Sequence, residues 1–321
     1  MKRIIAGLAL TLLTPLLTLS AQAQTYPSKP IRLITPFAPG GGTDFIARLI
    51  AQKLTERLGQ QVIVDNKPGA GSTMGTELAL KSPSDGYTLL VTPASYTVNA
   101  SIYKLNFDPL NDITPIVQIS SGPYVVAVHP SLPVKTLKEL VDYARANPDK
   151  LSYGSAGNGS STHLATDFFL DVAKIKMLHV PYKGTGPALN DTIAGNVQLI
   201  FGSVAATLQF VKSGRLRALA VTTPQRISAE PDVPTVAESG YPSYEVTNWS
   251  GLSGPKGLPR EVVERLNREV NDIIKGADVI KVLATDGLSP AGGSSERFAR
   301  IISTEIPRWS RVVKSSGMKI D

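Results

Sequence analysis

Apolar and polar residues follow one another along the chain in two periods, one typical of strands and one typical of helices. Short apolar runs at 31–37, 61–65 and 87–92 predict buried strands. Between these runs, apolar residues spaced three and four positions apart predict helices at 43–58 and 73–81. Strands separated by helices indicate an α/β fold with a mostly parallel sheet that is flanked by helices on both faces.

The same alternation starts again after Asp108 and Pro109 and then gives way to a helical tail. Two successive α/β series predict two similar lobes. The second series and the tail contain these predicted elements: strands at 124–129, 151–155, 177–181, 197–201 and 216–222, and helices at 137–146, 162–172, 187–194, 204–212, 259–275 and 294–313.

We expect the chain to cross from one lobe to the other near Gly122 and to return between Val246 and Leu252. The predicted domains are a signal peptide at 1–23, a first lobe made of 24–122 together with 247–321, and a second lobe at 123–246. In this arrangement the C-terminal helices complete the first lobe.

The N-terminus has the layout of a secretory signal peptide. Lys2 and Arg3 precede an apolar run at 4–19, which is followed by the Ala-Gln-Ala sequence that ends at Ala23. The run is short for a membrane span and contains three threonines and a proline. We therefore expect export to the periplasm with cleavage near Ala23, and not a retained anchor helix.

The composition excludes several classes of protein and site. The chain has no cysteine, so it forms no disulfide, carries no lipid on cysteine and has no thiolate metal site or cysteine nucleophile. Its 33 basic and 26 acidic residues give a mild net charge of +7, and they are interspersed. Without a long Lys/Arg block, a nucleic-acid partner is not expected. A slightly positive field would help to gather small anions.

A glycine-rich bend at 37–44 joins the first predicted strand to the helix that follows. Backbone N–H groups and the positive end of the helix dipole meet at such a bend, so it can hold an anion without a charged side chain. Thr43 and Asp44 suit the capping positions of that helix. Taken alone, the bend is more typical of an ordinary strand-to-helix turn, and the rest of the chain decides between the two interpretations.

The second lobe has a comparable bend at 153–163, which also follows a strand and precedes a helix. It lacks the third glycine of the dinucleotide fingerprint, and neither bend continues into the Gly-Lys-Ser/Thr sequence of nucleotide-binding loops. No cofactor is therefore expected. Because ligands bind at the C-terminal ends of the strands in α/β sheets, the two bends should face one cleft. Four charge-assisted hydrogen bonds there would supply about 6–12 kcal/mol before the costs of ordering and closure.

Catalytic motifs are scarce in comparison. No His-Glu-x-x-His, Gly-x-Ser-x-Gly or paired metal-ligand spacing is present, so neither an enzyme nor a metal site is expected. His129 and His179 stand at apolar strand ends and are interpreted as structural. His163 begins a helix, where it either touches a ligand or caps. A nucleophile and base that meet only on folding remain the alternative.

Three further segments end strands that point toward the expected cleft. Thr92 and Ser95 follow the third strand of the first lobe, and Gly202 and Ser203 end a strand of the second. They would be either a secondary wall of the site or ordinary loop residues. Lys183 either adds a cation to the cleft or is solvated.

Several sequence segments, spread along nearly the whole mature chain, resemble segments of one protein family. They are the segment from Tyr26 to Asp44, Asn66-Lys-Pro-Gly-Ala-Gly71, Asp85-Gly-Tyr-Thr-Leu-Leu90, His179-Val-Pro-Tyr-Lys-Gly184, Leu216–Thr222 and Pro231–Thr235. In these segments the chain is similar to the Bug family (Bordetella uptake gene products), which comprises extracytoplasmic solute receptors of the tripartite tricarboxylate transporter type.

The resemblance implies a two-lobed periplasmic-binding-protein type II (Venus flytrap) fold that holds a ligand carboxylate between loops of both lobes, partly through ordered waters. Carried over to this chain, the ligand contacts are Phe37, Ala38, Pro39, Gly40, Gly41, Gly42, Thr43 and Asp44 in the first lobe and Ser155, Ala156, Gly159, Ser160, Ser161, Thr162 and His163 in the second, with Thr92, Ser95, Gly202 and Ser203 as secondary wall.

One position departs from the family pattern. Many relatives have an acidic residue where Gly202 stands. If that acid meets an amino group, its absence weakens an amino-acid ligand and favours a plain mono- or dicarboxylate, aromatic ones included. We therefore expect a monomeric, non-catalytic receptor that serves the permease subunits of a tripartite tricarboxylate transporter. The alternatives are a ligand-sensing partner of a two-component sensor kinase and a periplasmic enzyme acting on a carboxylate.

Overall fold

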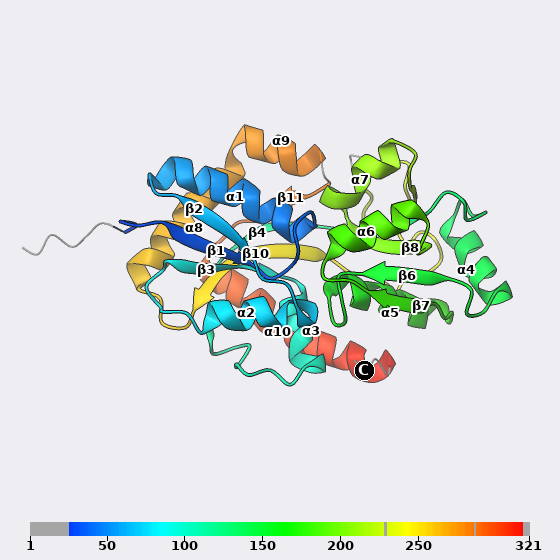
Figure 1. The fold of residues 1–321 in the computed structure, drawn as a ribbon, viewed down its shortest axis with the longest axis horizontal. Coiled ribbons are helices and arrows are strands. Elements are labelled where there is room, and N and C mark those ends of the chain that lie inside the picture. Colours follow the sequence, from blue (N-terminus) through cyan, green and yellow to red (C-terminus); the bar gives the residue numbers. More distant parts are fainter. Residues whose placement is uncertain (1–25, 228–229, 286, 317–321) are drawn as a thin grey trace, which may run out of the picture.

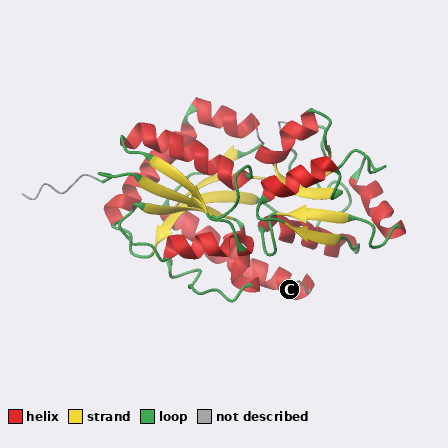
Figure 2. Cartoon of the chain, viewed as in Figure 1, coloured by secondary structure: helices red, strands yellow, loops and turns green. Residues whose placement is uncertain are grey.

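Two separate sheets, each covered by helices, form the two lobes of the protein (Figure 1). The computed structural model describes residues 26–227, 230–285 and 287–316, so the predicted signal peptide at 1–23 lies outside the described residues. Among these residues, no helix combines the length and the apolar character that a membrane span needs. The predicted two-lobed α/β fold is confirmed, with helices on both faces of each sheet (Figure 2).

The sheet of the first lobe has the strand order β11-β4-β10-β3-β1-β2. Its strands are β1 (Ile31–Thr35), β2 (Val62–Asn66), β3 (Thr88–Pro93), β4 (Ile113–Gly122), β10 (Asn248–Pro255) and β11 (Ser289–Pro290). β1 pairs in parallel with β2 and β3, whereas β10 is antiparallel to both β3 and β4. The sheet is therefore mixed. The chain leaves for the second lobe along β4 and returns along β10, which runs in the opposite direction.

The sheet of the second lobe has the order β7-β6-β8-β5-β9. Its strands are β5 (Tyr124–Val128), β6 (Ser152–Ser155), β7 (Leu178–Pro181), β8 (Leu199–Ser203) and β9 (Arg217–Val221). β6 is parallel to β7 and β8, and β5 is antiparallel to β8 and β9. This sheet is mixed as well, because the chain enters the lobe along β5 and inserts that strand antiparallel between β8 and β9.

Helices bury both faces of each sheet. In the first lobe, α1 (Gly42–Leu58), α8 (Arg260–Lys275) and α9 (Ala277–Thr285) pack on one face, and α2 (Thr73–Leu80), α3 (Ser95–Ile102) and α10 (Ser295–Ser316) on the other. In the second lobe, α4 (Leu137–Ala146) and α5 (Ser161–Ala173) cover one face, and α6 (Thr185–Ala194) and α7 (Val204–Lys212) cover the other. A short 3₁₀ turn, η1 (Ala70–Ser72), precedes α2.

Strand β5 shows why the sequences of such strands are continuous apolar runs. Tyr124, Val126 and Val128 enter the core beneath α4 and α5, while Val125 and Ala127 enter the core beneath α6 and α7. Because successive side chains of a strand point to opposite faces, a strand covered on both faces needs an apolar residue at every position.

Helix α10 belongs to both cores. Phe298 and Ile302, near its start, pack with Trp249 in the first lobe, whereas Trp309 and Val313 pack into the main core of the second lobe. Figure 1 shows α10, in red, running along the underside of the molecule from one lobe to the other. Part of the segment 247–321, which was predicted for the first lobe, therefore also packs on the second lobe. The lobe boundaries stay a prediction.

Candidate functional site

A small cavity of about 30 Å³ lies between the lobes, where β1, β3, β6 and β8 end. Its lining comes from both lobes and includes no charged side chain. The lining residues are Phe37, Gly41, Gly42, Thr43, Pro93, Tyr124, Ala156, Ser160, Ser161, Thr162, Thr185, Ser203 and Asn248.

Helix α1 presents its N-terminus to this cavity. The N-cap residue is Gly41, and no side chain caps the first turn. The first helical hydrogen bond runs from Phe45 N–H to Gly41 O at 3.0 Å, which leaves the amides of Gly42 and Thr43 at the cavity wall. A first turn without a side-chain cap can donate to an anion.

Asp44 shapes the first bend and does not line the cavity. Its carboxylate is buried and accepts hydrogen bonds from Gly40 N–H at 3.1 Å, from Arg48 Nε at 2.9 Å and from Asn66 Nδ2 at 2.9 Å. Burial alone would raise the pKa of Asp44, but these three hydrogen bonds outweigh it and hold that pKa below its ordinary value. The carboxylate thus stays ionised and holds Gly40, one residue before the cap.

Helix α5 contributes the second N-terminus. Its N-cap Ser160 accepts from His163 N–H at 3.3 Å, and Thr162 Oγ1 accepts from Ala156 N–H at 2.9 Å. These side chains fold the bend back onto the start of the helix. Ser161 and Thr162, the first two residues of α5, lie at the cavity wall.

Two further helices also begin at the cavity. Gly184 and Ser203 are the N-caps of α6 and α7, and neither helix has a side-chain cap. Thr185 and Ser203 line the cavity, and Ser203 Oγ is buried without a hydrogen-bond partner among the described residues. The N-termini of α1, α5, α6 and α7 therefore converge on one point between the lobes.

Tyr124 and Asn248 complete the lining with side chains from the two crossings between the lobes. The Tyr124 hydroxyl donates to Asn248 Oδ1 at 3.0 Å. Burial raises the pKa of Tyr124 well above its usual value, so its hydroxyl stays protonated. Sequence reasoning missed both residues, together with Pro93 and Thr185. The predicted crossings at Gly122 and 246–252 could have pointed to Tyr124 and Asn248, because the chain passes between the lobes there.

The structure brings together about half of the predicted contacts. Phe37, Gly41, Gly42, Thr43, Ala156, Ser160, Ser161, Thr162 and Ser203 lie around the cavity. Ala38, Pro39 and Gly40 instead close against the second lobe, since Ala38 N–H donates to Lys183 O at 3.2 Å and Gly186 packs on Pro39 and Gly40. Lys183 is exposed and contributes its carbonyl, not its ammonium group, to this contact.

Other predicted contacts are engaged away from the cavity. Thr92 Oγ1 donates to Ser253 Oγ at 2.8 Å, and Ser95 Oγ lies 2.9 Å from Ser72 Oγ. Thr92 and Ser95 thus hydrogen-bond to other residues of the first lobe and do not form the expected secondary wall. Ser155 and Gly159 belong to the histidine cluster described below.

Gly202 faces α7 and not the cavity. A Cβ at this position would lie 2.0 Å from Thr207 Oγ1. A longer side chain at 202 would point in the same direction, because the next residue along β8, Ser203, is the one that reaches the cavity. The absence of an acid at 202 therefore gives no structural ground for excluding an amino-acid ligand.

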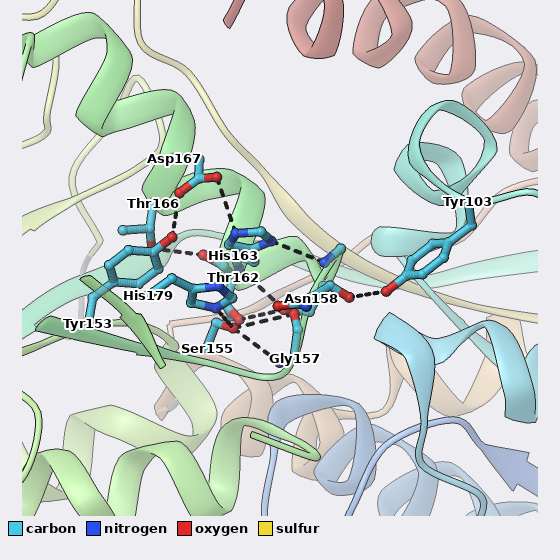
Figure 3. Close-up of polar contacts among 12 residues, drawn as sticks. Tyr103, Tyr153, Ser155, Gly157, Asn158, Thr162, His163, Thr166, Asp167 and His179 are labelled. Carbon is cyan, nitrogen blue, oxygen red and sulfur yellow. Dashed lines mark hydrogen bonds and ion pairs between the residues drawn. The ribbon is translucent and has the colours of Figure 1, made fainter. Parts of the chain in front are cut away.

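His163 lies behind the second bend in a polar cluster with Asp167, His179, Tyr153 and Ser155 (Figure 3). Its Nδ1 accepts from Gly159 N–H at 3.1 Å, and its Nε2 lies 3.1 Å from Asp167 Oδ2. The ring of His179 stacks on that of His163 with the centroids 3.9 Å apart. Of the two roles considered for His163, the structure favours the structural one, and His163 does not line the cavity.

Known proteins match this chain closely. The family model described as "Tripartite tricarboxylate transporter family receptor" matches residues 46–318. Protein BugT of Bordetella pertussis is 34% identical over 100% of this chain and 99% of its own length. Two solved structures are an R. palustris protein with adipate (TM-score 0.89, 35% identity, 92% of this chain and 99% of that one) and MatC from Rhodopseudomonas palustris with bound malate (TM-score 0.86, 30% identity, 90% and 100%).

The match of the family model covers most of the chain, and the similarity to BugT runs along its full length. The predicted resemblance is confirmed, and the periplasmic-binding-protein fold of the solved relatives agrees with the two lobes seen here. This chain belongs to the tripartite tricarboxylate transporter receptor family and is one of its Bug-type members.

Proposed function

We propose that this chain is a periplasmic receptor that captures a small mono- or dicarboxylate between its lobes and delivers it to the permease subunits of a tripartite tricarboxylate transporter. One observation carries the proposal: four helix N-termini converge on an interlobe cavity that has no charged side chain in its wall. Such a site favours an anion through backbone amides and helix dipoles alone.

The chemistry of the lining points to a carboxylate. Amides of α1 and α5 and the hydroxyls of Ser161, Thr185 and Ser203 lie around the cavity, and Ser203 Oγ has no hydrogen-bond partner among the described residues. Each hydrogen bond to a charged group contributes about 1.5–3 kcal/mol, so four of them supply about 6–12 kcal/mol before the costs of ordering and closure, against about 8 kcal/mol for micromolar affinity. The relatives solved with adipate and with malate hold ligands of this class.

The contacts between the lobes support capture by closure. Ala38 N–H bonds to Lys183 O across the cleft, and the Tyr103 hydroxyl donates to the Asn158 carbonyl of the other lobe. A cavity of about 30 Å³ has room for about two waters. An organic acid must therefore enter while the lobes are apart, or extend into the neighbouring cavity of about 360 Å³ that shares Ala156.

A ligand screen tests the proposal. We expect mono- and dicarboxylates, including adipate, malate and benzoate, to include at least one that raises the thermal unfolding temperature, because a ligand of the folded state stabilises it. Calorimetry should then give one site per monomer. Matched amides of the same acids, which lack the charge, are the control and should produce no shift. Equal shifts with acid and amide would contradict an anion site.

The fate of the ligand separates the receptor from the two alternatives. Chemically unchanged ligand recovered after denaturation supports a receptor, whereas a converted product supports an enzyme. For the sensing role, the test is transport: deletion of the gene should abolish uptake of the labelled ligand. Unchanged uptake, with loss of a transcriptional response to the ligand, would favour a partner of a sensor kinase.

A further inference from the structure

The binding bend of the second lobe is held from behind by two imidazoles. Gly159 N–H donates to His163 Nδ1 at 3.1 Å. Gly157 N–H donates to Ser155 Oγ at 3.1 Å, and that oxygen lies 2.6 Å from His179 Nε2. Gly157 has a φ of +117° and Gly159 a φ of +71°, both in the left-handed region. The bend therefore depends on hydrogen bonds that fix an unusual backbone path. Figure 3 shows both histidines beside Gly157 and Asn158 of this bend.

The partners of His163 fix its protonation state. Gly159 N–H is a donor, so Nδ1 must be unprotonated to accept it, and the proton of the neutral ring must sit on Nε2, which faces the Asp167 carboxylate at 3.1 Å. A second proton, on Nδ1, would point an N–H donor of the ring at the Gly159 N–H donor, and the hydrogen bond between them would be lost. The bend can therefore keep this hydrogen bond only while the ring is neutral.

The stack opposes a positive charge on both rings at once. The two imidazole rings are nearly parallel, 8° apart in angle with centroids 3.9 Å apart, and Tyr153 stacks on the far face of His179 at 4.8 Å. Burial, and next the charge that His163 would carry, lower the pKa of His179 to about 4, although Asp167 opposes this. Two cationic rings at this distance would repel each other.

Two further titratable groups, Asp167 and Tyr153, contact the pair. Asp167, from α5, bonds His163 and also accepts from the Tyr153 hydroxyl of β6. Burial comes first among the effects that raise the pKa of Tyr153, so it stays neutral. Burial would raise the pKa of Asp167, but the hydrogen bonds from His163 and Tyr153 outweigh it and keep that pKa low. Asp167 is therefore ionised over the whole range in which imidazoles titrate.

We propose that His163 and His179 are positioning residues whose neutral stacked pair holds the bend at Ala156–Ser160 in its carboxylate-binding shape, so that protonating the pair loosens the bend and weakens ligand binding. This inference rests on the proposed function, since it concerns the same site. Neither ring touches the cavity, and both act through the loop amides of Gly157 and Gly159. Acidification should thus weaken binding even of an anion that remains charged.

The first experiment needs no ligand. The chain has three histidines, so the imidazole nitrogens of the whole protein can be resolved by ¹⁵N NMR. We expect His163 at pH 7.5 as the Nε2–H tautomer with a hydrogen-bonded Nδ1, and we expect the Gly159 amide to lose its exchange protection as the pair takes up a proton. His129, which lies outside the cluster with Nδ1 2.7 Å from Ser131 Oγ, is the internal control. An Nδ1–H tautomer of His163, or a Gly159 amide that ignores the titration, would overturn the proposal.

The second experiment measures affinity for adipate and malate as probes, by calorimetry at pH 7.5 and 4.5, which brackets the onset of protonation of His179. His163→Leu removes the acceptor of Gly159 N–H and should weaken binding at least tenfold at pH 7.5. His163→Asn restores an acceptor that does not titrate, so it should bind within threefold of wild type at pH 7.5 and lose less affinity on acidification. Protonation of the probe affects all variants equally and cancels in this comparison.

The matched control is His129→Asn, which should follow wild type at both pH values. Wild-type affinity in His163→Leu, or the same loss on acidification in His163→Asn as in wild type, would contradict the proposal. If His163→Leu does not fold, the comparison of His163→Asn with wild type still decides. If neither probe binds wild type, the choice of carboxylate is wrong, and the NMR titration alone confirms or refutes the role of the pair.

Discussion

Position 42 cannot carry a side chain while the lobes are closed. A Cβ on Gly42 would lie 2.6 Å from Ser203 Oγ and 2.8 Å from Ser203 Cβ, which belong to the other lobe. A contact this short forces one of the two groups to move, and overpacking of this kind costs about 1–3 kcal/mol.

We therefore expect Gly42→Ala to weaken ligand binding about tenfold or more by opposing closure, while the unfolding temperature without ligand stays near that of wild type. Calorimetric titration with the ligand from the screen measures the first effect, and a thermal melt the second. Because Ser203→Gly also removes a hydroxyl from the cavity wall, the clash is tested by a double-mutant cycle: Gly42→Ala should cost less affinity in a Ser203→Gly background than in wild type. An equal cost in both backgrounds would mean that the clash is not the cause.

His179 gives a second prediction at this scale, on stability. Burial, and then the charge of His163, lower the pKa of His179 from 6.5 to about 4 in the folded protein. Between these two values the unfolded chain binds more protons, so the free energy of unfolding falls as the pH falls from about 6.5 to 4, by at most about 3 kcal/mol. Below the lower value this loss stops growing.

Urea denaturation at pH 7.5 and 4.5 checks this effect. His179→Gln keeps a polar partner for Ser155 and removes the titrating ring, so its unfolding free energy should depend less on pH than that of wild type. His129→Gln, at the histidine outside the cluster, should leave the wild-type dependence unchanged. Equal pH dependence in wild type and His179→Gln would show that His179 is not the group responsible.

Single residues of the site were predictable where the chemistry is local. The bend at 37–44 and the helix start at Ser160 follow from glycine, serine and threonine at the ends of apolar runs, and both reach the cavity. Tyr124 and Asn248 could not be identified in the same way, because only folding brings two residues 124 positions apart within 3.0 Å. The stack of His163 on His179 was equally inaccessible, since the two residues come from different elements.

Among the elements, regular patterns were read correctly and small-residue strands were missed. The runs at β1, β3 and β8 are apolar and were predicted, whereas β10, with the sequence Asn-Trp-Ser-Gly-Leu-Ser-Gly-Pro, has no apolar run. Its small residues are required by packing, because Gly251 lies directly beneath the ring of Phe298 on α10. Helices α3 and α9 and strand β4 were missed as well, and β4 contains polar residues along much of its length.

This packing makes a prediction for the element pair β10 and α10. A Cβ at Gly251 would lie 2.1 Å from Phe298 Cζ. Gly251→Ala should therefore lower the free energy of unfolding by about 1–3 kcal/mol, as overpacked cores do. Chemical denaturation measures this loss. Adding Phe298→Leu to Gly251→Ala should cost less than the sum of the two single changes, and strict additivity would argue against the contact.

At the scale of the whole molecule, α10 joins the two lobes. It packs Phe298 into the first core and Trp309 into the second, and its Glu305 accepts from Trp249 Nε1 at 2.9 Å and from Thr97 Oγ1 at 3.0 Å. Burial raises the pKa of Glu305, although these hydrogen bonds oppose it. The sequence predicted the helix but not its shared role, because helical periodicity does not say which cores the apolar stripe will meet.

We expect Trp309→Ala to uncouple the lobes. Loss of a buried tryptophan costs about 3–5 kcal/mol, and here the cost falls on the contact between α10 and the second core. Differential scanning calorimetry should show one unfolding transition for wild type and two for the variant. Ile280→Ala, on the exposed face of α9, is the control and should keep the single transition. One transition in Trp309→Ala would mean that other contacts couple the lobes.

The uncharged wall of the cavity has a consequence for how such receptors diversify. In the proposed binding mode main-chain amides hold the acid group, and every sequence supplies them, so replacing wall side chains such as Tyr124 or Asn248 would leave that contact in place. A lineage can then acquire a new nutrient by exchanging these side chains without first losing the ability to bind. The side chains that determine selectivity can change while the main-chain contribution to affinity is retained.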